Sequence, residues 1–185
     1  MDAFSYLSVL LSIILGLAMT QILQGYRMIL LARRRVDYDP LPVAWSVLVL
    51  LFATQAWWAS FGLRDHSDWN FLGFTIVLLQ MVLLYMMAGI IRPDLAGERI
   101  DLAAHFDDHR RAFFGFMLAM LVTSVVKDAL LNFSLPGSLN LLFHGLLMVS
   151  AIIGMASSSR RVHYALAVFA AAAFTAYVAL LFARL

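Results

Sequence analysis

Six stretches of apolar residues alternate with shorter polar stretches along the chain. They cover residues 4–31, 41–63, 71–91, 112–133, 139–156 and 164–183. Each is close in length to the helix of roughly 20 residues that crosses the hydrocarbon core of a bilayer. All four prolines fall at the edges of these stretches, where helices begin or end: Pro40, Pro42, Pro93 and Pro136. The pattern predicts an all-α polytopic membrane protein, with residues 1–185 forming one six-helix transmembrane bundle.

Composition narrows the class of protein further. Hydrophobic residues make up 63% of the chain and charged residues 13%, and the mean hydropathy is +0.88. A soluble domain carries about 25% charged residues, so these values exclude an ordinary soluble protein. The formal charge is only +2, and the basic residues sit in short loops, so we expect no nucleic-acid partner. The absence of cysteine excludes disulfides, thiolate metal sites and cysteine nucleophiles.

Basic residues divide unequally between the predicted loops. The first, third and fifth loops hold nine of them, Arg33, Arg34, Arg35, Arg92, Arg99, Arg110, Arg111, Arg160 and Arg161. The second and fourth loops hold only Arg64. Because basic loops stay in the cytoplasm, we expect the odd loops there and both termini in the periplasm of a bacterial inner membrane. The long third loop also predicts a cytoplasmic amphipathic segment at about residues 98–111, lying on the membrane surface.

A stripe of small and polar residues runs along one face of the first predicted helix. Its members are Ser5, Ser8, Ser12, Gly16, Thr20 and Gln24. In membranes, small residues spaced four apart let helix backbones approach closely, and hydroxyls bond across helices. We therefore expect this stripe to face inward as a helix-packing seam.

Polar side chains from three predicted helices fall at one depth, in the outer half of the membrane. Lys127 and Asp128 lie on the fourth helix, Asn140 and His144 on the fifth, and Gln55 on the second. Ionisable groups inside a membrane are costly and point by default to function. Adjacent helical residues diverge by about 100°, so we expect Lys127 and Asp128 to find separate partners, His144 being the partner of Asp128.

Three interpretations of this polar layer remain open. It is a substrate or ion pathway, with Ser8 and Ser12 as one wall, or a structural cluster that fixes helix register. In the third interpretation, Lys127 extends its side chain to the outer lipid headgroups and takes no part in a cluster. Gln21 and Gln80, deeper in the bundle, are expected to bridge helices rather than to contact a ligand.

Metal and cofactor chemistry has little support in the sequence. His105 and His109 are spaced i, i+4, as metal-binding histidines often are, but no third ligand has suitable spacing and nearby arginines oppose a cation. They are a weak candidate, and we predict no metal site. Only His144 lies within a span, which excludes paired haem ligands, and no nucleotide-binding or hydrolase motif occurs. We therefore predict a protein that is not an enzyme and has no cofactor.

The first half of the chain resembles a group of short six-helix bacterial integral membrane proteins with no assigned function. The resemblance rests on the segment from Tyr6 to Gln21, on Gln55-Ala56-Trp57-Trp58 and on Arg92-Pro93. It implies a bacterial inner-membrane location and transfers no active site.

Three functions fit these observations. The first is a small channel or transporter whose polar layer binds an ion or a small polar solute. The second is a non-catalytic scaffold or sensor that assembles with a membrane or cytoplasmic partner protein. The third is a lipid- or quinone-binding protein with its ligand against Trp57, Trp58 and the first helix. A homo-oligomer is expected because six short helices offer little room for a private pathway.

Overall fold

A computed structural model describes residues 3–93 and 99–182, most of them helical. The elements in chain order are α1 (Ala3–Leu31), β1 (Val36–Asp37), α2 (Pro40–Ser60), the 3₁₀ turn η1 (Phe61–Leu63), α3 (Phe71–Ile90), β2 (Ile100–Asp101), α4 (Leu102–Asn132), α5 (Ser138–Ala156), α6 (Arg160–Tyr177) and the π turn η2 (Val178–Phe182). In this part of the chain six helices are long and apolar enough to cross a membrane, as the hydropathy pattern predicts.

Side-chain caps fix where three of the helices begin. Asp39 accepts a hydrogen bond from the Leu41 amide at the start of α2, whose first residue is Pro40. Asn70 accepts one from the Gly73 amide at the start of α3, and Asp101 accepts two at the start of α4. Such caps satisfy amide groups that have no partner within the helix. At the other end of α4, Phe133 adopts the left-handed conformation and stops the helix.

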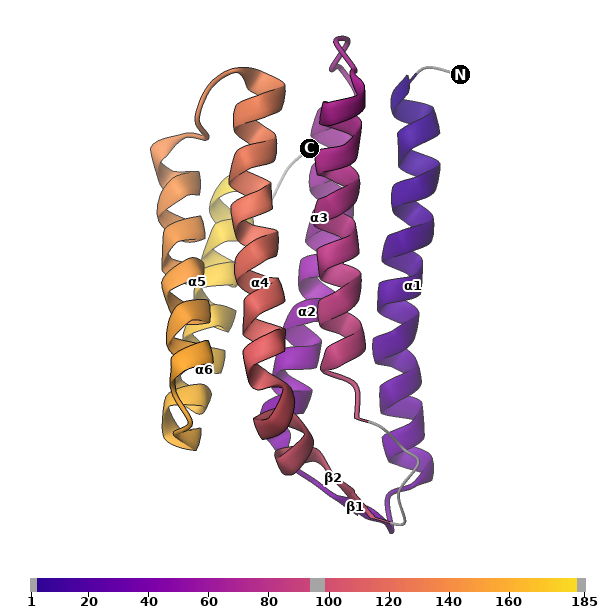
Figure 1. Cartoon of the computed structure of the whole chain (residues 1–185), viewed down its shortest axis with the longest axis vertical. Helices are drawn as coiled ribbons and strands as arrows, with labels where there is room; N and C mark the ends of the chain where they lie inside the picture. The colour runs from indigo at the N-terminus through magenta and orange to yellow at the C-terminus, as the bar shows by residue number, and fades with distance from the viewer. Residues whose placement is uncertain (1–2, 94–98, 183–185) are drawn as a thin grey trace.

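The six helices form two layers (Figure 1). Helices α1, α3, α4 and α5 stand side by side in that order, and α2 and α6 lie behind them. Helix α2 packs against α1, α3, α4 and α6, so it is the most central helix of the bundle. Helix α1 is at one edge, where it packs against α2 and α3.

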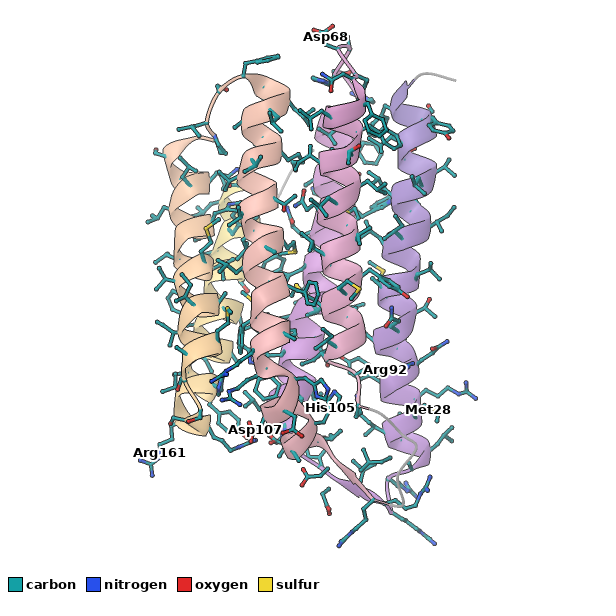
Figure 2. All side chains as sticks on the ribbon, viewed as in Figure 1. Met28, Asp68, Arg92, His105, Asp107 and Arg161 are labelled. Atoms are coloured by element: carbon teal, nitrogen blue, oxygen red, sulfur yellow. The ribbon has the colours of Figure 1, made fainter. Side chains whose placement is uncertain are left out.

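The two ends of the bundle differ in charge. The connecting residues 33–35, 92–93, 99–101 and 157–159 share one end, which we call the arginine-rich end. The connections after α2 and after α4 share the other, the arginine-poor end. Figure 2 shows Asp68 at the arginine-poor end and Arg92, Asp107 and Arg161 toward the opposite one. The predicted odd loops therefore do lie together.

The predicted packing seam on α1 is wrong. The helix buries the opposite face, formed by Leu7, Leu11, Leu15, Ala18 and Ile22. Ser12, Gly16, Thr20 and Gln24 are exposed, Ser5 and Ser8 are half-buried, and no atom lies near a Cβ built on Gly16. The contact with α2 and α3 is made mainly by large apolar side chains, with Ala18 as the one small residue among these five.

The polar segment before the fourth span joins the helix that follows it. Helix α4 begins at Leu102 and runs without interruption for 31 residues, so residues 102–111 are its first turns rather than a separate helix. Its start is held by a two-residue parallel pairing of β2 with β1. Residue 98, where the predicted segment begins, lies outside the described residues.

An aromatic cluster fills the interior toward the arginine-rich end. Its members are Trp45 of α2, Phe106, Phe113 and Phe114 of α4, and His163 of α6, none of them more than 1% exposed. The Phe114 ring lies 5.0 Å from Trp45 and 5.6 Å from His163, measured between ring centroids. Edge-to-face and stacked rings at these separations attract each other beyond simple burial. This end of the bundle is therefore densely packed.

Candidate functional site

A cavity of about 260 Å³ lies between five helices. Its walls come from α2, α3, α4, α5 and α6, and α1 takes no part. It extends from Leu84 and Leu147 in the interior to Gly62 and Asn132, which are exposed at the arginine-poor end. At roughly 30 Å³ per molecule, it has the volume of about nine waters.

Lys127 and Asp128 of α4 form an ion pair at the wall of this cavity. The Lys127 Nζ lies 3.3 Å from the Asp128 Oδ1, and the side chains are 15% and 25% exposed. The prediction that these neighbours find separate partners is wrong, since the four-carbon stem of lysine bends back across the angle between them. Lys127 lines the cavity, which does not support its extension toward the headgroups. Both signs of charge therefore face one space, and their sum is zero.

His144 of α5 faces the same cavity but does not pair with Asp128. Its Nδ1 lies 3.0 Å from the Asn140 carbonyl oxygen, to which it donates. In the neutral ring, Nε2 then accepts from the Ser124 hydroxyl of α4, 3.2 Å away. The imidazole thus links α4 to α5 and is fixed by a bond at each nitrogen. Tyr177 of α6 packs with its ring centroid 5.8 Å from that of His144.

Two of the residues that line the cavity are amides whose side-chain oxygens have no hydrogen-bond partner. The Gln80 Oε1 of α3 and the Asn140 Oδ1 of α5 are both buried and accept no hydrogen bond. Gln80 is only 9% exposed in total. A buried carbonyl without a donor costs about 1–3 kcal/mol, so these two groups are a cost to the folded state unless a cavity occupant donates to them.

Polarity changes with depth along the cavity. On α4, the lining residues run from Met120 and Leu121, through Ser124, to Lys127 and Asp128. The rise of the helix separates Met120 from Lys127 by about 10 Å. On α5 the same order holds, with Leu147 deep and Asn140 near the mouth. The cavity therefore has a charged mouth and a mainly apolar floor, with Gln80 as a polar group at depth.

Packed aromatic rings separate the cavity floor from the arginine-rich end. Phe114 precedes Met120 by six residues on α4, about 9 Å along the helix axis. Gly154 of α5 lies directly against its ring, and a Cβ built there would be 2.7 Å from three ring carbons. The aromatic cluster thus packs between the floor of the cavity and the arginine-rich end.

Beneath the aromatic cluster, an ionic clasp ties three helices together. Arg160 of α6 pairs with Asp39 at the start of α2, and its other terminal nitrogen lies 3.5 Å from Asp107 of α4. The Tyr164 hydroxyl donates to Asp39 at 3.2 Å. Asp39 is only 6% exposed, so its carboxylate is shielded from solvent, whereas the Arg160 side chain is 36% exposed. Figure 2 shows Asp107 at the arginine-rich end of α4. The clasp holds α2, α4 and α6 together where the bundle is closed.

Five of the seven predicted pathway residues line the cavity. These are Gln55, Lys127, Asp128, Asn140 and His144. Ser8 and Ser12 do not, because α1 stands outside it. The Ser8 hydroxyl donates to the Ser5 carbonyl of its own helix, and Ser12 accepts a hydrogen bond from the Trp57 indole at 3.3 Å on an exposed face.

The residues that line the cavity without having been predicted site residues include Gln80, Ser124 and Tyr177. Gln80 was expected to bridge helices; its position as the one polar group near the middle of its span was a usable signal. Ser124 and Tyr177 gave no such signal, since serine and tyrosine are common in membrane helices. Gln21 packs over Gly89 of α3, where a built Cβ would be 2.8 Å from its Oε1.

His105 and His109 have structural roles. The His105 Nε2 donates to the Ile90 carbonyl at 3.0 Å, which fastens the start of α4 to the end of α3. The His109 Nδ1 lies 2.9 Å from the His105 carbonyl, and the two rings stack. Within residues 3–93 and 99–182, no group of three or more His, Asp or Glu side chains is placed to hold a metal ion.

Comparison with known proteins gives no relative: no protein-family model, curated protein or solved structure matches this chain. The function must therefore be argued from the cavity itself.

Proposed function

We propose that this chain is a multi-pass protein of a bacterial inner membrane that binds a small polar solute in the cavity and carries it across. The observation that supports this most is the cavity itself, which joins a charged pair, a histidine and two unpartnered amide oxygens. A structural polar cluster would satisfy its own hydrogen bonds. Gln80 and Asn140, which both line the cavity, instead keep buried side-chain oxygens that have no donor.

The charge of the loops gives the direction. With the arginine-rich end in the cytoplasm, both termini are periplasmic and the cavity opens toward the periplasm. The state described here is then outward-facing. Solute enters at the Lys127–Asp128 pair, and the aromatic cluster and the ionic clasp close the path to the cytoplasm.

Transport requires the aromatic cluster and the ionic clasp to open. Arg160 must leave Asp39, and the rings of α4 must separate from Trp45 of α2 for the floor to open. Asp128 and Lys127 hold the solute at the mouth meanwhile. Their mutual ion pair keeps each charge neutralised when no solute is bound, so the empty site carries no uncompensated charge.

Flux into proteoliposomes tests this function. Stopped-flow light scattering measures the entry of glycerol, urea and leucine with the wild-type chain and with Asp128→Asn. We expect at least one of these solutes to enter faster than into empty liposomes, and Asp128→Asn to lower that rate by about tenfold, about 1.4 kcal/mol of barrier. The Arg64–Asp65 pair offers a matched control, because it is also formed by adjacent residues but is exposed and outside the cavity. Asp65→Asn should leave the rate unchanged; equal loss in both variants, or none in either, removes Asp128 from the mechanism.

A solute sensor that binds without transporting is the second candidate. The observation in its favour is the tight closure at the arginine-rich end, where cluster members are at most 1% exposed. Such a protein would pass the binding event to a partner through the cytoplasmic loops. Solute binding to the purified chain, together with no flux above that of empty liposomes, would support the sensor over the transporter.

A further inference from the structure

We infer that the solute class of this cavity is an amino-acid zwitterion with an apolar side chain. This rests on the proposed function and specifies what the cavity binds. The first argument is electrostatic. One wall presents an ammonium group and a carboxylate 3.3 Å apart, both partly exposed to the cavity.

A charged ligand fits this wall poorly. An anion would pair with Lys127 and leave Asp128 beside it without a counter-charge, and a cation would do the reverse. Removing a partner from a buried pair is costly, because a charge is left uncompensated in a medium of low polarity. A zwitterion brings both charges at once. Its carboxylate pairs with Lys127 and its ammonium with Asp128, so every charge remains paired.

The unpartnered amides offer further acceptors, Asn140 near the mouth and Gln80 deeper in the cavity. An ammonium group carries three donors, and Asp128 accepts only part of them. The Gln80 Oε1 and the Asn140 Oδ1 are buried acceptors without donors on the walls of the same cavity. Each oxygen is shielded from solvent, so its side chain must turn toward the ligand before an N–H can reach it. A ligand N–H that bonds to it then removes the cost of a buried unpaired carbonyl, which favours a donor-rich ligand.

The volume of the cavity and the change in its polarity with depth indicate which side chain the ligand carries. The cavity volume of about 260 Å³ leaves room for leucine, a solute of about nine heavy atoms. Below the charged pair the walls are apolar and aromatic: Phe52, Met81, Leu84, Met120, Leu121 and Leu147. Phe52 packs edge-to-face on Phe174 at 4.9 Å and closes one side. An α-amino acid places its two charges at one end and an aliphatic chain at the other, as the cavity does.

A set of four matched ligands tests the inference on the purified, detergent-solubilised chain by isothermal titration calorimetry. They are leucine, 4-methylpentanoate, which lacks the ammonium, 3-methylbutylammonium, which lacks the carboxylate, and 4-methylpentanamide, which is uncharged. We expect leucine to bind about tenfold or more tightly than each of the other three, the scale of one charge-assisted hydrogen bond. Glycine, without the apolar chain, should bind more weakly than leucine.

The double variant Lys127→Met/Asp128→Leu removes both charges. It should reduce the ratio of the affinities for leucine and for 4-methylpentanamide to about one. The matched variant Arg64→Met/Asp65→Leu should retain the preference. If the double variant does not fold, the four ligands measured on the wild-type chain still test the inference.

If 4-methylpentanamide binds as tightly as leucine, the zwitterion assignment is overturned and a cavity for polar solutes remains. A single-charge analogue that binds most tightly also overturns it. If no ligand binds and proteoliposomes show no flux, both the assignment and the proposed function fall.

Discussion

Gly154 is the position where one added methyl group tests the packing of the closed end most sharply. A Cβ built there would lie 2.7 Å from Cδ2, Cε2 and Cζ of Phe114, a separation that real contacts do not show. The ring cannot turn away, because Trp45, Phe113 and His163 surround it with centroids 5.0, 5.1 and 5.6 Å distant. Helix α5 must then move away from α4.

The size of the effect follows from two opposing contributions. Overpacking a dense core costs about 1–3 kcal/mol, and the rigid surroundings of Phe114 favour the upper part of that range. Replacing glycine by alanine inside a helix returns about 1 kcal/mol. We therefore expect Gly154→Ala to lower the free energy of unfolding by about 1–2 kcal/mol, or several degrees of Tm for a chain of this length.

Gly145 provides the control on the same helix. No atom lies within 4 Å of a Cβ built there, so Gly145→Ala should gain only the helix propensity and be neutral or slightly stabilising. Thermal unfolding in detergent, followed by circular dichroism, compares the two variants under one condition. A Gly154→Ala variant as stable as Gly145→Ala would refute the close approach of α5 to Phe114.

Two further substitutions probe the clasp and the cavity. Asp39→Asn keeps the helix cap, because asparagine caps as well as aspartate, but removes the charge that pairs with Arg160. We expect thermal unfolding to show that the free energy of unfolding falls by about 1.5–3 kcal/mol. Asp37→Asn, which removes a charge from an exposed pair, should change it by less than about 1 kcal/mol. Similar losses in both variants would mean that the clasp adds nothing to the stability of the protein. Gln80→Leu removes a buried unpartnered carbonyl and should leave stability unchanged or raise it by about 1 kcal/mol, while solute binding by calorimetry weakens. Lower stability with unchanged binding would make Gln80 a structural residue.

The six helices could be predicted because hydropathy and proline placement report the same boundaries. Pro40 is the first residue of α2, and Pro93 and Pro136 lie just beyond the ends of α3 and α4. The caps strengthen the same boundaries, since Asp39 before Pro40 is a recognisable start signal. The short pairing of β1 with β2 could not be predicted, because two-residue strands leave no periodic pattern.

The orientation of α1 could not be read from its sequence for a physical reason. Leu7, Leu11 and Leu15 repeat every four residues on one face, and Ser8, Ser12 and Gly16 repeat with the same spacing on another. Lipid is as apolar as leucine, so hydropathy does not distinguish a face that packs on protein from one that meets lipid. Both stripes are compatible with helix packing, and only the shape of α2 and α3 selects the leucine face.

The candidate site could be predicted in outline but not in its contacts. Depth alone brought Gln55, Lys127, Asp128, Asn140 and His144 into one layer, and the cavity joins all five. The Lys127–Asp128 pair was missed because helix angles describe Cβ directions and ignore the reach of a lysine stem. The role of Gln80 depends on what surrounds its Oε1, which no single-chain pattern records.

Access to Gln80 from one side of the membrane is the most direct test of the central claim, a solute cavity open at the arginine-poor end and closed at the other. The chain has no cysteine, so Gln80→Cys introduces a single thiol without further changes. A charged, membrane-impermeant methanethiosulfonate is applied to intact cells and to inverted vesicles, with Ser67→Cys and Arg161→Cys marking the two ends. We expect the thiol at position 80 to react from the side that labels position 67 and not from the side that labels position 161. Reaction from the side of position 161, or from neither side while both markers react, would contradict a cavity that opens at the arginine-poor end.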